Sequence, residues 1–256
     1  RRQRQMCIRD SYWNGRLLSL LAFILTALSV VLWSWKYGNI GIGIFVVLLL
    51  LTAKPIFSFG HLHRVDMLGV ALSALSFTFT ICWNSKVIMA IGILLMILAF
   101  HVKITFVAAP LACAIALFHQ GRSKALLIVL SWLIGAVGGL LLLQWWTHGA
   151  YIFQAKLANL PALWTKPLDM LTRPLTSSPF WMLALVLWWR KSKSQYLPEV
   201  IYCFCSLIVA GVTSTNPGSS WNYLMEFYVA SALLSVRLLS SLPVDIISRQ
   251  ASILFL

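Results

Sequence analysis

Long blocks of apolar residues without a single charge constrain this chain more than any other feature. Residues 17–35 and residues 125–146 contain no Asp, Glu, Lys or Arg. A helix of about 20 apolar residues crosses a hydrocarbon core of roughly 30 Å. The composition agrees, because 10% of the residues are charged, whereas a soluble domain carries roughly 25%. The blocks therefore predict membrane-spanning helices and not the core helices of a soluble protein.

The order of the apolar blocks predicts an all-α fold, a polytopic transmembrane helical bundle with about nine membrane segments. We expect one transmembrane domain over residues 1–256, interrupted by a hydrophilic loop at 147–178. Segment 179–189 is short, so it must extend into its flanks, tilt, or lie in the interface. The nine predicted segments are 17–35, 38–53, 66–83, 87–101, 104–119, 125–146, 179–189, 199–213 and 223–242.

The net charge of +14 would suggest a nucleic-acid partner in a soluble protein. Here the charges lie between apolar blocks, where they set topology and attract anionic lipid head groups. We therefore expect membrane lipids as partners and no nucleic acid. The chain has no glycine-rich phosphate loop followed by Lys and Ser or Thr, so nothing indicates an ATP-driven pump.

The topology depends on the segment around Lys103. Residues 87–118 as one helix would be about 48 Å long at 1.5 Å per residue, longer than a bilayer is thick. A turn at residues 101–103 would give two short helices instead, although no Gly or Pro marks such a turn. If Arg122 and Lys124 are cytoplasmic, the turn leaves the Arg-rich N-terminus outside, against the charge rule. We favour the turn because it brings the polar segments described next to one membrane face.

Charged residues beside apolar blocks are candidates for function, because they are expensive to hold in a membrane. Each also has a simpler interpretation. Arg64 and Asp66 could be an interfacial pair at a helix start, Lys103 could extend to the head groups, and Glu226 could be capped at a helix N-terminus. His61 and His63 with Asp66 are a weak metal-site candidate. The four polar segments are 54–66, 103–105, 147–178 and 216–226.

Motifs in four segments resemble one family in their order along the chain. The run GRLLSLL at 15–21 resembles the entry to a span in GT-C membrane glycosyltransferases, in the branch similar to protein O-mannosyltransferases (family 39). PIFSFG at 55–60 with RVDML at 64–68 resembles the Arg-x-Asp loop of that branch. KIT at 103–105 with AAPLA at 108–112 resembles its Lys-centred segment, which often has Gln where this chain has Ile104. GSSWNYLME at 218–226 resembles its Asn-Tyr-x-x-Glu segment.

The resemblance implies that a sugar is transferred from a polyprenyl-phosphate donor to an acceptor hydroxyl on the extracytoplasmic side. It also implies a multi-pass protein of a bacterial cytoplasmic membrane, with 147–178 as an extracytoplasmic loop. We expect no resident cofactor, and a divalent metal stays open as an alternative without support from the sequence. Asp66 would be the catalytic candidate, orienting Arg64 or assisting the acceptor, and cations would stabilise the phosphate. The implied donor- or acceptor-binding residues are Arg64, Lys103, Asn222, Tyr223 and Glu226.

One part of the family pattern has no counterpart. Such enzymes carry an acidic catalytic motif in the first extracytoplasmic loop, and nothing in this chain matches it. The chain starts with Arg1 and not with Met, so we expect a fragment that lies downstream of that loop and is inactive by itself. A secondary transporter or channel subunit remains an alternative, although no inverted repeat is visible. A non-catalytic membrane scaffold is the other alternative.

Overall fold

The computed structural model describes residues 2–37, 39–60, 65–118, 121–151, 172, 197–215 and 221–241. This part of the chain is helical and contains no β-strand, as the apolar blocks predict. Its elements in chain order are α1 (Arg2–Lys36), α2 (Ile40–Thr52), α3 (Lys54–Gly60), α4 (Asp66–Cys82), α5 (Lys86–Val102), α6 (Ala108–Phe118), α7 (Arg122–Trp146), α11 (Leu197–Thr213), the 3₁₀ turn η2 (Trp221–Leu224) and α12 (Met225–Ser240).

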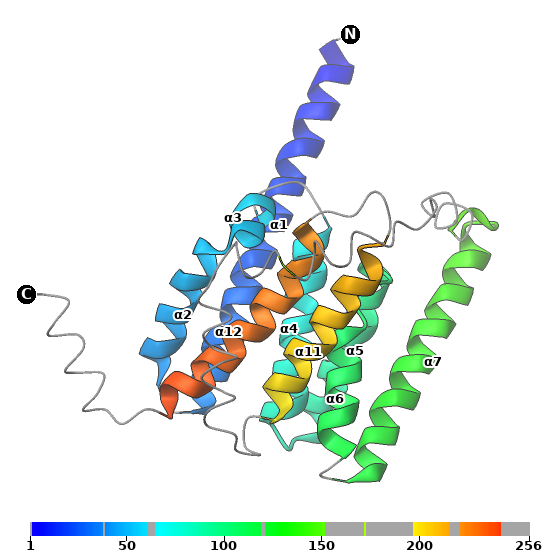
Figure 1. Ribbon diagram of the computed structural model, residues 1–256. Coiled ribbons are helices and arrows are strands. Elements are labelled where there is room, and N and C mark those ends of the chain that lie inside the picture. The colour runs from blue at the N-terminus through cyan, green and yellow to red at the C-terminus, as the bar shows by residue number, and fades with distance from the viewer. Residues whose placement is uncertain are drawn as a thin grey trace, which may run out of the picture.

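The long helices run up and down through one bundle (Figure 1). Helix α4 contacts α1, α5, α6 and α12, while α12 contacts α1, α2, α4 and α11. These two helices therefore form the centre of the described bundle, and α7 packs at its edge against α5 and α6. The first turns of α1 extend beyond the other helices at the end where α3 also lies (Figure 1).

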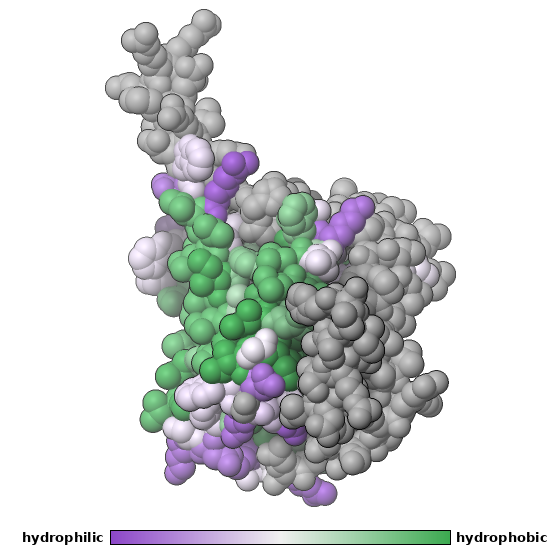
Figure 2. Space-filling view, turned by 90° about the vertical axis from the view of Figure 1, so that its left-hand side faces the viewer, coloured by the Kyte–Doolittle hydropathy of each residue, from purple (hydrophilic) through white to green (hydrophobic). Residues whose placement is uncertain are grey.

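Three helical segments are long and apolar enough to cross a membrane: Trp13–Lys36, Arg122–Trp146 and Asn222–Ser240. Five shorter apolar helices, α2, α4, α5, α6 and α11, accompany them. On the face that carries α1 and α2, apolar side chains form a band with hydrophilic residues below it and a few above (Figure 2). Eight of the nine predicted segments coincide with described helices, and 179–189 lies outside the described residues.

Small residues let the two central helices pack closely. The buried positions of α4 include Gly69, Ala71 and Ala74, and those of α12 include Ala230 and Ala232. In a membrane the hydrophobic effect does not drive helices together, because lipid tails are as apolar as the side chains. Small residues are favoured at helix interfaces because they let the backbones approach closely and gain van der Waals contact. The composition of α4 and α12 thus accounts for their position inside the bundle.

The predicted turn at Lys103 is confirmed. Helix α5 ends at Val102, and Lys103 is its extended C-cap residue, with φ −161° and ψ 125°. The amide of Phe106 then donates to the carbonyl of Lys103 at 3.0 Å, which reverses the chain before α6. Pro110 lies in the first turn of α6. Backbone amides in the first turn have no partner within the helix, so proline costs no helical hydrogen bond there.

Candidate functional site

The residues proposed from sequence gather at one end of the bundle. Asp66 begins α4, Lys103 follows α5, Asn222 and Tyr223 belong to η2, and Glu226 lies in the first turn of α12. Because α4 runs away from this end while α5 returns to it, the turn after α5 faces the start of α4 (Figure 1). Of the six proposed site residues, only Arg64 lies outside the described part of the chain.

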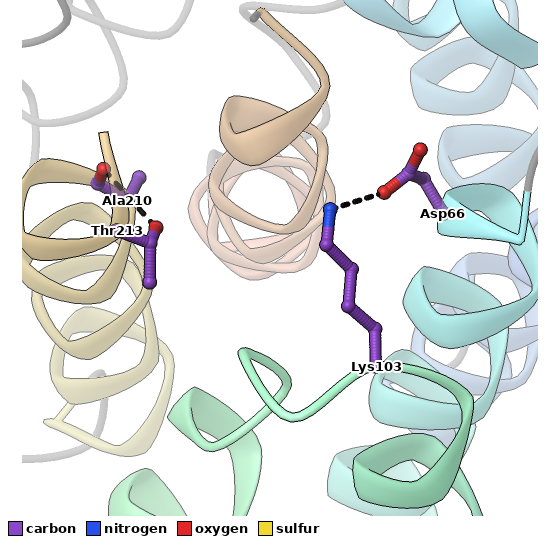
Figure 3. A network of polar contacts seen from close by, with 4 residues as sticks. All are labelled: Asp66, Lys103, Ala210 and Thr213. Carbon is purple, nitrogen blue, oxygen red and sulfur yellow. Dashed lines mark hydrogen bonds and ion pairs between the residues drawn. The ribbon is translucent and has the colours of Figure 1, made fainter. Parts of the chain in front are cut away.

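Asp66 and Lys103 form a salt bridge at this end. The ammonium nitrogen of Lys103 donates to Oδ1 of Asp66 at 2.6 Å, and Figure 3 shows the two side chains reaching toward each other from α4 and the α5–α6 turn. The side chain of Asp66 is 8% exposed and that of Lys103 is 24% exposed. The sequence predicted that Asp66 could orient Arg64, but its described partner is Lys103.

Tyr223 supplies the second contact of Lys103. The ammonium nitrogen lies 4.1 Å from the centroid of the Tyr223 ring, well within the range of a cation–π interaction. An ammonium has three donors, and one of them points at Asp66. Lys103 is therefore held by a carboxylate and an aromatic face, and it is not simply extended toward head groups.

Glu226 lines the same small space as this pair. It is 5% exposed, and the hydroxyl of Tyr202 on α11 donates to its Oε1 at 3.0 Å. Asn222 is 9% exposed, and its side-chain oxygen has no hydrogen-bond partner among the described residues. An unpaired buried amide oxygen carries a desolvation cost of about 1–3 kcal/mol. A donor that reaches the side-chain oxygen of Asn222 would remove this cost, so the oxygen is a favourable acceptor.

The space enclosed by these residues is small, about 10 Å³. That volume holds about one water molecule, so the cluster is closed in this structure. Figure 3 shows Thr213 on the far side of the site, where its hydroxyl bonds the carbonyl of Ala210 within α11. The lining residues are Asp66, Lys103, Thr105, Phe106, Ser206, Val209, Thr213, Asn222, Tyr223 and Glu226.

A glycine fixes the position of the α5–α6 turn. A Cβ atom at Gly69 would lie 2.0 Å from Cε2 of Phe106, so only glycine allows the Phe106 ring to pack on α4 at this point. Gly69 is one helical turn from Asp66, and Phe106 is three residues from Lys103. The same contact that seats Phe106 therefore sets the register between the two charged residues.

Sequence reasoning missed the α11 side of the site and one further buried carboxylate, that of Glu199. Tyr202 lies inside an apolar helix, and no pattern around it signals a partner for Glu226. Glu199 is 1% exposed at the opposite end of the α11–α12 pair, with Nε of Arg237 3.7 Å from its Oε1. The Arg237 guanidinium lies 3.6 Å from the ring centroid of Tyr37. Glu199 did carry a signal, a charge at the start of an apolar block.

The described residues contain no group of three or more His, Cys, Asp or Glu that could hold a metal ion. His61 and His63, which the weak metal hypothesis needs, lie outside those residues. Comparisons of the chain with protein-family models, curated proteins and solved structures found no match.

Proposed function

We propose that this chain is a glycosyltransferase-like membrane protein that binds a polyprenyl-phosphate-linked sugar at the Lys103 end of the bundle. The observation that carries the proposal is the convergence of Asp66, Lys103 and Tyr223 from three separate segments. A lysine at a membrane boundary suits a phosphate as a compact point charge. An aromatic ring and a carboxylate beside it suit a sugar, whose hydroxyls donate to carboxylates.

The reaction of such a protein joins the acceptor oxygen to the anomeric carbon of the sugar. The bond between that carbon and the phosphate oxygen breaks, and polyprenyl phosphate leaves with the electron pair. A base takes the acceptor proton, and cations stabilise the phosphate charge. Lys103 would have the cationic role, while Asn222 and Glu226 would hold hydroxyl groups. We place this site on the extracytoplasmic side, with the polyprenyl chain in the bilayer.

The donor would bind first at the rim of the cluster. A cavity of about 10 Å³ cannot contain a phosphate, but Lys103 and Tyr223 are only partly buried. One ammonium donor of Lys103 is engaged with Asp66, and a phosphate would share the remaining donors. Binding therefore requires a modest opening between η2 and the α5–α6 turn.

The test is binding of a photoreactive polyprenyl phosphate by the purified chain in lipid nanodiscs. We expect Lys103→Met to weaken binding by at least about tenfold, which corresponds to roughly 1.4 kcal/mol. Lys54→Met is the matched control, because Lys54 is an exposed lysine at the same end that does not line the cluster. Equal binding by the wild type and Lys103→Met would contradict the proposal.

Two buried carboxylates favour a second candidate, a proton-coupled secondary transporter. Glu199 and Glu226 lie on opposite ends of the α11–α12 pair, and Tyr202 of α11 contacts Glu226. Intramembrane acids commonly belong to proton relays. Proteoliposomes with an imposed pH gradient separate the candidates, because a transporter predicts proton flux that Glu226→Gln removes and Lys54→Met does not.

A further inference from the structure

A cavity lined by two lysines and by apolar side chains lies at the end of the bundle opposite the Lys103 cluster. Its volume is about 520 Å³. Its walls come from the α4–α5 connection, α5, the end of α6 and the start of α7. The lining residues are Thr80, Trp83, Asn84, Ser85, Lys86, Met89, Ala90, Ile93, Leu117, Ser123, Lys124, Leu127 and Ser131.

The N-termini of two helices meet at this cavity. Helix α5 begins at Lys86 and helix α7 begins at Arg122, and both start at the same end of the bundle (Figure 1). The N-cap residues Ser85 and Gly121 make no side-chain cap hydrogen bond. The first amides of a helix have no intrahelical partner and carry the positive end of its dipole. Residues from the starts of α5 and α7, Ser85, Lys86, Ser123 and Lys124, therefore line one cavity.

The charged side chains at these two helix N-termini are basic, which is the unfavourable sign beside the positive end of a helix dipole. Helix N-termini favour acidic residues, but the first turns of α5 and α7 contain none and hold Lys86, Arg122 and Lys124 instead. Neither Lys86 nor Lys124 pairs with an acidic residue of the described chain, and no described lining residue is acidic. Positive side chains on positive helix ends repel each other, and a bound anion removes that repulsion.

Part of the cavity wall is apolar. Met89, Ile93, Leu117 and Leu127 line it, and α7 beyond them exposes a row of apolar side chains that includes Leu130, Leu133 and Ile134. A free inorganic anion would gain nothing from such a wall, whereas the glycerol and acyl region of a lipid would. Basic pockets between membrane helices on the cytoplasmic side are suited to anionic head groups, and the charge rule assigns Arg122 and Lys124 to that side.

We infer that this cavity, bordered by Lys86, Lys124 and the N-termini of α5 and α7, binds the phosphate head group of an anionic phospholipid from the cytoplasmic leaflet. The head-group phosphate accepts from the two ammonium groups and from first-turn amides of the two helices. Its acyl chains leave along α7. The site is independent of the Lys103 cluster, and the proposal does not depend on a sugar donor.

The experiment counts lipid retained by the full chain. The protein is taken from nanodiscs of phosphatidylcholine with increasing phosphatidylglycerol of the same acyl chains, and bound lipid is measured by native mass spectrometry. We expect the wild type to retain phosphatidylglycerol, and Lys86→Gln with Lys124→Gln to weaken retention by at least about tenfold. Lys36→Gln is the control, since it removes a lysine from the same end without touching the cavity, and it should retain the lipid. The charge-preserving pair Lys86→Arg and Lys124→Arg should also retain it.

Three results would overturn the proposal. They are equal retention of phosphatidylglycerol by the double Gln variant, equal retention of phosphatidylcholine by the wild type, and inorganic phosphate that binds as tightly as the lipid. Melting temperatures in detergent establish that each variant is folded. If the double Gln variant is unfolded, the two single variants decide, and each should lose about fivefold in retention. Unchanged retention in both single variants would then reject the site.

Discussion

Oδ1 of Asp66 lies 2.6 Å from the ammonium nitrogen of Lys103, although 37 positions separate the two residues in sequence. The pair closes α4 onto the turn between α5 and α6. It also gives Lys103 a defined position, from which its ammonium group reaches the ring of Tyr223.

A double-mutant cycle should detect the coupling between Asp66 and Lys103. Asp66→Asn leaves a partly buried ammonium without its counter-charge, and Lys103→Met leaves a buried carboxylate alone. Because Lys103 is 24% exposed, solvent screens the pair, and we expect a coupling of about 1–2 kcal/mol. Thermal unfolding of the four proteins in detergent measures it. Additive effects of the two substitutions would contradict a direct interaction.

Gly69→Ala should lower stability by about 1–3 kcal/mol. The added Cβ would lie 2.0 Å from Cε2 of Phe106, so the ring must move and carry the α5–α6 turn with it. Gly138→Ala is the matched control in another apolar helix, since no described side chain or neighbouring segment lies within 4 Å of its added Cβ. That variant should be neutral or slightly more stable because alanine favours helix. Equal melting temperatures for the two variants would contradict the packing argument.

Tyr202→Phe should destabilise the bundle by about 0.6–1.7 kcal/mol, which spans the average and the largest values for hydrogen bonds between membrane helices. The substitution removes the hydrogen bond from the Tyr202 hydroxyl to Oε1 of Glu226 and keeps the ring. Tyr223→Phe serves as the comparison, because it keeps the aromatic face under Lys103. Unfolding in detergent should rank Tyr202→Phe as less stable than Tyr223→Phe, and the reverse order would argue against the Tyr202–Glu226 contact.

The two ends of the bundle should lie on opposite sides of the membrane. In a background without native cysteines, Thr105→Cys and His148→Cys should react with an impermeant thiol reagent from one side. Ser85→Cys and Ser123→Cys should react from the other. The sequence hypothesis adds that Arg64→Cys and Ser219→Cys label with the first pair. Labelling of positions 105 and 85 from the same side would exclude this topology.

The purified chain should bind polyprenyl-phosphate lipids but transfer no sugar. Each acidic residue of the described Lys103 cluster is already engaged, Asp66 by Lys103 and Glu226 by Tyr202. Positioning and phosphate stabilisation raise the rate only when a base also takes the acceptor proton. Radiolabelled polyprenyl-phosphate sugars and a panel of acceptors provide the assay. Transfer that disappears in Asp66→Asn would show that Asp66 is the catalytic base.

The helical class was predictable because it follows from the length of the apolar blocks. The turn at Lys103 was predictable because it brings the polar segments to one membrane face, and not from any Gly or Pro at the turn. The sequence predicted that Lys103, Asp66 and Tyr223 lie at the same membrane face, because the order of the helices determines which helix ends share a face. It did not predict which of these side chains touch. The pairing of Asp66 with Lys103 was not predictable, because the sequence offers Arg64, two residues away, as an equally plausible salt-bridge partner for Asp66. Tyr202 was hidden for another reason: a tyrosine inside an apolar helix has no periodic pattern that reveals what its hydroxyl contacts.

The burial of α12 has a consequence for how the protein is made. The segment Asn222–Ser240 is the least apolar of the three candidate spans, and 78% of it is buried, against 11% for the span of α7. Insertion of such a weakly apolar helix into lipid alone is only slightly favourable. The helices that cover it, α1, α2, α4 and α11, all precede it in the chain. We therefore expect its integration to depend on helices synthesised earlier, which would make the order of translation part of the folding pathway.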